Sequence, residues 1–187
     1  MTATGPGQSP LLLADVAAVL NSQKIDYAVV GALAVAVHGM MRASIDADAI
    51  VAATTSQLAG LQKQLVEAGF DVEQRRGGVD DPIAAMIIIA DRFGNRVDLL
   101  IGMKGLEGSV YERAIQMQIP GFHSTLKIVG REDLIAMKIA AGAPKDLLDA
   151  EGCIRVAGKL LDVALVRRLA KQFGQDAEKN CAKLLPR

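Results

Sequence analysis

Residues 42–51, Arg-Ala-Ser-Ile-Asp-Ala-Asp-Ala-Ile-Val, place two carboxylates inside an otherwise apolar run. Successive side chains of a strand point to opposite faces, so Asp46 and Asp48 would share one face with their backbones about 6.5–7 Å apart. Aspartate is depleted in strands and is almost never buried without a partner. Two carboxylates this close raise each other's pKa unless a cation joins them. We therefore expect this strand to bind a divalent cation, and Mg²⁺ prefers such hard oxygen ligands.

A third acid has a similar setting, because Asp98 is flanked by apolar residues in segment 95–101, Asn-Arg-Val-Asp-Leu-Leu-Ile. If its strand pairs beside the first, three carboxylates meet and could hold two cations about 3.5–4 Å apart. Asp98 could instead act as a general base for an attacking hydroxyl. The alternative is structural, with Asp98 in an ion pair with Arg96 or Arg42.

Hydrophobic periodicity predicts an α/β (α+β) chain, with a mixed β-sheet flanked by helices and a C-terminal helical region. We expect a loose tail at 1–10, an α/β core at 11–130 and packed helices at 131–187. Strands are expected at 25–30, 45–52, 70–73, 84–90, 96–101 and 126–129. Helices are expected at 11–21, 32–38, 57–68, 110–117, 132–141, 145–157, 162–173 and 175–184. Gly31 falls at a strand-to-helix turn, where free N–H groups suit an anion.

Composition excludes several functional classes. Basic and acidic residues both number 21, which argues against a nucleic-acid coat or a polybasic membrane binder. Aromatic residues make up 3% of the 187 residues, so stacking platforms for single strands are not expected. The chain has no run of 18 apolar residues, and we expect no membrane association. Cys153 and Cys181 are unclustered, which fits buried thiols in a cytoplasmic protein rather than a zinc site.

Segments 31–34 (Gly-Ala-Leu-Ala), 38–39 (His-Gly) and 42–48 (Arg-Ala-Ser-Ile-Asp-Ala-Asp) resemble the signature of the DNA polymerase beta-like nucleotidyltransferase superfamily. That signature is a glycine turn, a helix and then Arg-x-Thr-x-Asp-x-Asp. The chain looks closest to the AbiEii-type abortive-infection toxins and more distantly similar to antibiotic nucleotidyltransferases. Segments 134–141 and 145–149 are similar to the lysine and aspartate helices of AbiEii-like proteins.

The resemblance implies a nucleotidyltransferase fold and Mg²⁺-dependent transfer of a nucleoside monophosphate from an NTP to an acceptor hydroxyl, with two ions. For the metal site, the resemblance implies that Asp46 and Asp48 are ligands and that Asp98 is a third ligand or a base. For the nucleotide, it implies contacts by Gly31 and Ala32, a phosphate contact by Lys138, and orientation of the triphosphate or support of the strand by Arg42 and Ser44. Asp146 matches the acid in the last motif of the family. Ala32 replaces the usual second glycine, which could narrow the approach to phosphate. Ser44 replaces the usual threonine and keeps its hydroxyl.

The acceptor is left open among three alternatives. It could be RNA, such as a tRNA end, in which case the protein would be the toxin of a toxin–antitoxin pair and would bind an antitoxin protein. It could be a small hydroxylated compound such as an antibiotic. The third alternative is a non-catalytic module that binds a nucleotide or a partner, for which Ala32 is the only support in the sequence.

Overall fold

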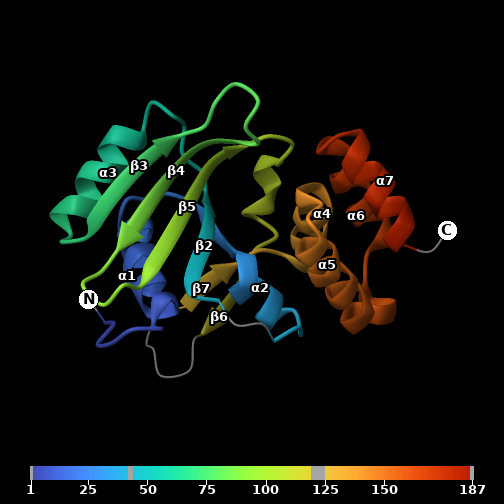
Figure 1. The fold of residues 1–187 in the computed structure, drawn as a ribbon, viewed down its shortest axis with the longest axis horizontal. Coiled ribbons are helices and arrows are strands. Elements are labelled where there is room, and N and C mark those ends of the chain that lie inside the picture. The colour runs from blue at the N-terminus through green and yellow to red at the C-terminus, as the bar shows by residue number, and fades with distance from the viewer. Residues whose placement is uncertain (1, 42–43, 119–124, 186–187) are drawn as a thin grey trace.

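The computed structural model describes residues 2–41, 44–118 and 125–185, and a seven-stranded sheet forms its centre (Figure 1). The spatial order of the strands is β3-β4-β5-β2-β1-β7-β6. Their bounds are β1 Tyr27–Val30, β2 Asp46–Val51, β3 Asp71–Arg76, β4 Ile83–Ala90, β5 Arg96–Met103, β6 Ile115–Gln118 and β7 Thr125–Ile128.

The sheet is mixed, as the sequence predicted. Strand β2 runs antiparallel to β1 and parallel to β5, and β1 runs parallel to β7. The outer strands form the antiparallel ladders β3-β4-β5 and β6-β7. The two strands that carry the aspartates are therefore central neighbours, although 44 residues of chain separate the end of β2 from the start of β5 (95 − 51 = 44).

Seven α-helices of the described residues surround this sheet. Their bounds are α1 Ser9–Ser22, α2 Gly31–Val37, α3 Leu58–Glu67, α4 Arg131–Ala141, α5 Pro144–Ala157, α6 Val163–Gln172 and α7 Gln175–Leu184. Figure 1 shows α4 to α7 gathered beside the sheet, while α1 lies across it. None of the helices in these described ranges is long and apolar enough to cross a bilayer.

The main core lies between α1 and the central strands. Ala47 and Ala49 of β2 are buried, and so are Leu12, Val16 and Leu20 of α1. Burying a leucine or valine side chain contributes about 1.5–3 kcal/mol, so α1 stabilises this face of the sheet strongly. The aspartates alternate with the buried alanines, which leaves them on the opposite face. Cys153 and Cys181 are buried and free, as expected of structural thiols.

Two local predictions were wrong. The helix predicted at 110–117 is absent, and a 3₁₀ turn at Gly108–Val110 precedes strand β6. Ile115 and Met117 alternate with glutamines, a period-2 pattern that is satisfied by pairing with β7. Strand β3 extends to Arg76 rather than ending at the predicted residue 73, so Arg75 and Arg76 lie on an edge strand.

The first turn of α1 is tied to the sheet. The Ser9 hydroxyl donates to the Ile45 carbonyl and accepts a hydrogen bond from the Arg96 N–H at 3.1 Å. Just before the helix, the Gln8 N–H donates to Asn95 Oδ1 at 2.6 Å. Residues 8 and 9, within the expected tail, are therefore hydrogen-bonded to the segments in which β2 and β5 begin.

Candidate functional site

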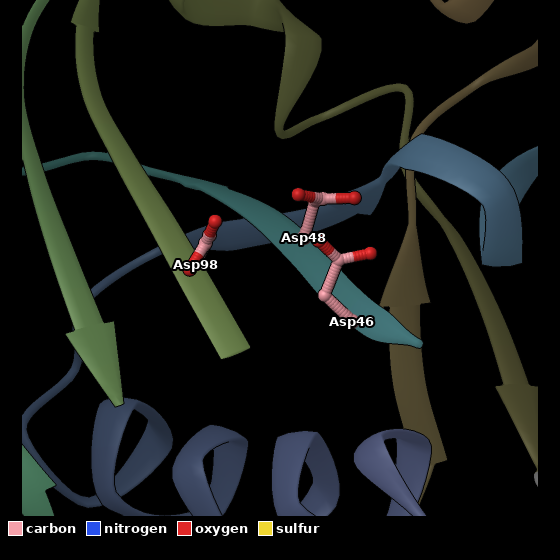
Figure 2. A group of neighbouring side chains, drawn as sticks. All are labelled: Asp46, Asp48 and Asp98. Atoms are coloured by element: carbon pink, nitrogen blue, oxygen red, sulfur yellow. The ribbon is translucent and has the colours of Figure 1, made fainter. Parts of the chain in front are cut away.

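The register of β2 and β5 brings three carboxylates together. Asp48 of β2 is the direct cross-strand partner of Asp98 of β5. Asp46 lies two residues before Asp48 on β2. One carboxylate oxygen from each residue lies within 4.8 Å of the other two. Figure 2 shows the three side chains on the face of the sheet that points away from the helix below them. We call Asp46, Asp48 and Asp98 the acidic triad.

Gly31 brings the β1–α2 turn against this triad. Its φ is +64°, in the left-handed region that favours glycine. A Cβ at this position would lie 2.0 Å from Oδ2 of Asp48, so a side chain has no room. The glycine is thus required both by backbone conformation and by the close approach of Asp48. Ala32, the replacement for a second glycine, is buried in α2.

The surroundings of Asp48 disfavour its ionised form. Burial, followed by the charges of Asp46 and Asp98, raises the pKa of Asp48 to about 6. A cation among the three groups would favour the charged form and reverse this effect. Carboxylate oxygens are the donors that Mg²⁺ takes in proteins, so the residues present fit such an ion.

Two polar neighbours orient the triad. The Ser44 hydroxyl donates to Oδ1 of Asp46 at 2.7 Å. Arg96 donates from Nε to Oδ1 of Asp98 at 2.7 Å and from Nη2 to Oδ2 at 2.8 Å. Asp98 thus has the structural ion pair that the sequence left as an alternative, and it also belongs to the triad. The choice between Arg96 and Arg42 as partner needed the structure, and Arg42 lies outside the described residues.

Lys138 is bound by two acids of α5. Its Nζ lies 2.6 Å from Oδ1 of Asp146 and 3.0 Å from Oδ2 of Asp149. The exposed fractions of the three side chains are 13%, 12% and 6%. Asp149 was not singled out from the sequence as a site residue, although it ends the segment 145–149. Its i,i+3 spacing from Asp146, which places both on one helix face, was the signal for this pairing.

A cavity of about 500 Å³ joins the triad to this lysine cluster, a size typical of ligand pockets. Gly31 and Asp48 line its sheet side, and Lys138 and Asp146 line its helix side. The rest of the wall is mainly apolar and includes Leu100, Met103, Leu134, Met137 and Phe173. The structure thus brings four residues singled out in the sequence to one cavity, while Asp46 and Asp98 adjoin it through Asp48.

A mixed sheet with this acidic centre beside a strand-to-helix glycine defines the class of proteins with a nucleotidyltransferase fold. Within that class, the chain belongs to the family described as "Nucleotidyltransferase of unknown function (DUF6036)", whose model matches residues 11–185. No curated protein matches the chain.

Solved structures agree on the fold. An antigenic nucleotidyltransferase-like protein from Paracoccidioides brasiliensis is 17% identical, with a TM-score of 0.54 over 97% of this chain and 89% of that one. The antibiotic-resistance factor ANT(2'')-Ia in complex with adenylyl-2"-tobramycin is 15% identical, with a TM-score of 0.52 over 89% of this chain and 96% of that one. At these identities the likeness concerns the fold alone, and the resemblance to AbiEii-type toxins stays a prediction.

Proposed function

We propose that this protein transfers a nucleoside monophosphate from an NTP to an acceptor hydroxyl. The acceptor hydroxyl would release its proton to water, and its oxygen would form a bond to the α-phosphorus. The bond from that phosphorus to the bridging oxygen would break, and pyrophosphate would leave with the electron pair. The single observation that carries the proposal is the convergence of Asp46, Asp48 and Asp98 beside a nucleotide-sized cavity. Family membership supports it independently.

The acidic triad would hold one or two Mg²⁺ ions. Such ions neutralise phosphate charge and stabilise the attacking and leaving oxygens when bound. Of the two roles open to Asp98, metal ligand and general base, its place in the triad, with a carboxylate oxygen within 4.8 Å of one from Asp46 and one from Asp48, favours the first.

The cavity would take the nucleotide, with its triphosphate toward Gly31 and its base and ribose against the apolar wall. An ammonium group has three N–H donors, and the two carboxylates of α5 engage two of those of Lys138. The third would be available to a phosphate oxygen. Asp146 and Asp149 would then position Lys138 rather than contact the nucleotide themselves.

For the acceptor we propose a small hydroxylated compound. Acidic side chains predominate around the cavity and the triad, with Asp80, Asp146 and Asp149 adding to the triad's charge against Lys104, Lys138 and Arg96. Mg²⁺ at the triad would offset part of this charge, and the 21 basic residues of the chain only equal its 21 acidic ones, so no excess of positive charge favours a polyanion such as RNA. The adenylylated tobramycin in the ANT(2'')-Ia structure is a precedent within the fold for a small acceptor. Transfer to a tRNA end by an antitoxin-controlled toxin is the alternative.

The experiment is incubation with each labelled NTP and Mg²⁺, with total RNA in one arm and a pool of small hydroxylated compounds in the other. We expect a labelled small product, whereas labelled RNA would support the toxin alternative. Asp46→Asn and Asp48→Asn should each abolish transfer while circular dichroism stays unchanged. Asp71→Asn, on the exposed start of β3, is the matched control. Full activity in either triad variant would overturn the proposal.

Binding measurements distinguish an active enzyme from a catalytically inert protein with the same fold. If no label is transferred in any arm, titration of Mg²⁺ and of each NTP distinguishes two cases. Binding of a nucleotide without transfer would identify a nucleotide-binding module. Absence of binding for both would contradict the proposed site itself.

A further inference from the structure

The acidic triad already contains a cation, the guanidinium of Arg96. Both oxygens of Asp98 accept hydrogen bonds from it, at 2.7 and 2.8 Å, in the side-on geometry that makes arginine–carboxylate pairs strong. Arg96 is also the cross-strand partner of Asp46. Its side chain therefore lies on the face shared by all three carboxylates and partly offsets their charge.

The side chains of Arg96 and Asp98 differ in their exposure to solvent. The Asp98 side chain is 10% exposed, whereas that of Arg96 is 41% exposed. The backbone of Arg96 is held by the Ser9 hydroxyl, which accepts its N–H at 3.1 Å. The carboxylate is consequently fixed in the site, and the long arginine side chain can rotate toward solvent without moving β5.

We propose that Arg96 is a positioning residue that holds Asp98 in the metal-free protein and releases it when Mg²⁺ binds the triad. The inference rests on the proposed function, since it assumes that the triad binds Mg²⁺. The side-on contact uses the lone pairs of Asp98 that face Arg96, and a guanidinium beside the ion would repel it. Before the ion binds, the arginine keeps three neighbouring carboxylates from destabilising the sheet.

Competition of this kind lowers the affinity for Mg²⁺. Hydrogen bonds to charged groups contribute about 1.5–3 kcal/mol, so breaking the contact should cost about tenfold in affinity or more. Arg96→Gln should therefore bind Mg²⁺ about tenfold more tightly than the wild type. Arg96→Lys keeps the charge but not the two-point contact, and its affinity should fall between the two.

The test is calorimetric titration of the full chain with MgCl₂, without nucleotide. Arg75→Gln is a matched control. Arg75 pairs with Glu73 two residues away, the same spacing as in the pair of Arg96 with Asp98, but it lies on the exposed edge strand β3. Arg75 interacts with Asp98 only through longer-range electrostatics, so the control should change the affinity far less than Arg96→Gln does. An affinity of Arg96→Gln equal to or weaker than that of the wild type would overturn the inference.

A second measurement follows the side chain directly. The Nε–H resonance of Arg96 in the wild type, assigned by its loss in Arg96→Lys, should move toward the position of a solvated arginine at saturating Mg²⁺, while that of Arg75 stays in place. An unchanged Arg96 resonance at saturation would overturn the inference even if Arg96→Gln fails to fold. If Mg²⁺ binds neither the wild type nor the variants, with or without NTP, the proposed function fails as well, which distinguishes the two failures.

Discussion

Asp48 is where proton and metal binding compete. Burial and the neighbouring acids raise its pKa to about 6. Only the ionised carboxylate binds a cation, so protonation must weaken Mg²⁺ binding as the pH falls through this value. We expect the apparent affinity to be about tenfold weaker near pH 5 than near pH 7, and nearly constant above that.

Calorimetric titration across this pH range checks the expectation. Any residual binding by Asp48→Asn should lack the step near the pKa of Asp48, because the titrating group is gone. A wild-type affinity that does not change between the two pH values would contradict the expected role of Asp48 as a ligand.

Gly31 is predicted to be required for metal binding as well as for stability. Gly31→Ala adds a Cβ that would lie 2.0 Å from Oδ2 of Asp48, so the carboxylate must move. Gly94→Ala is the matched control, because Gly94 has a φ of +78° with nothing within 4 Å of its would-be Cβ. Backbone strain alone should cost each variant about 1–2 kcal/mol of the free energy of unfolding.

Urea unfolding and Mg²⁺ titration separate the two effects. Gly94→Ala should lose stability and keep the wild-type affinity for Mg²⁺. Gly31→Ala should lose more stability and also most of its affinity. Equal behaviour of the two variants in both measurements would show that contact with Asp48 is not what requires a glycine at residue 31.

At the scale of the element, the junction of α4 and α5 depends on one half-buried cation, Lys138. Lys138 offsets two carboxylates whose side chains are only 12% and 6% exposed. Removing one partner of a buried ionic cluster leaves uncompensated charge, which typically costs about 3–5 kcal/mol. Lys138→Met should therefore destabilise the protein by about this amount in urea unfolding.

Lys145→Met is its control, because Lys145 is exposed at the start of α5 and should be nearly neutral. Combining Lys138→Met with Asp146→Asn and Asp149→Asn should recover much of the stability, since no unpaired charge remains. If Lys138→Met were as stable as the wild type, the cluster would not be a structural centre of the α4–α5 junction.

Local sequence patterns predicted the helices and strands better than they predicted which strands pair and which side chains make contact. Alternation of aspartate with small apolar residues placed Asp46 and Asp48 on one face, and Gly31 marked a turn, because both signals act within a few residues. The sequence carried no local sign that β2 pairs with β5, since that choice depends on packing across the whole sheet. The pairing of Lys138 with Asp149 depends on the packing of α4 against α5. The pairing of Arg96 with Asp98 lies within β5, and the sequence offered it as one of two alternatives. The period-2 pattern of β6 was short enough to be mistaken for a helix.

For the whole molecule, a partly buried ionic network joins the connector after β5 to the C-terminal helices. Arg113, in the connector after β5, donates from Nε and Nη2 to both oxygens of Asp133 on α4, at 2.7 and 2.6 Å. It also pairs at 2.7 Å with Glu107, which Arg168 of α6 holds by two hydrogen bonds. These bonds from Arg168, and one from Gln172, keep the pKa of Glu107 well below its ordinary value. The acidic triad lies wholly on the sheet, whereas the cavity is lined by both the sheet and the C-terminal helices.

This arrangement predicts that nucleotide and metal binding can be separated. Arg113→Met would leave Asp133, whose side chain is 2% exposed, without this partner. It should loosen α4, which carries Met137 and Lys138, and the end of α6 next to Phe173, all three of which line the cavity. We expect the affinity for NTP to fall by about tenfold or more, while Mg²⁺ binding at the triad stays close to that of the wild type. Arg155→Met, at an exposed position on α5, should change neither. Parallel loss of both affinities with the secondary structure intact would mean that the triad, too, depends on the helices, and that the sheet does not form the metal site alone.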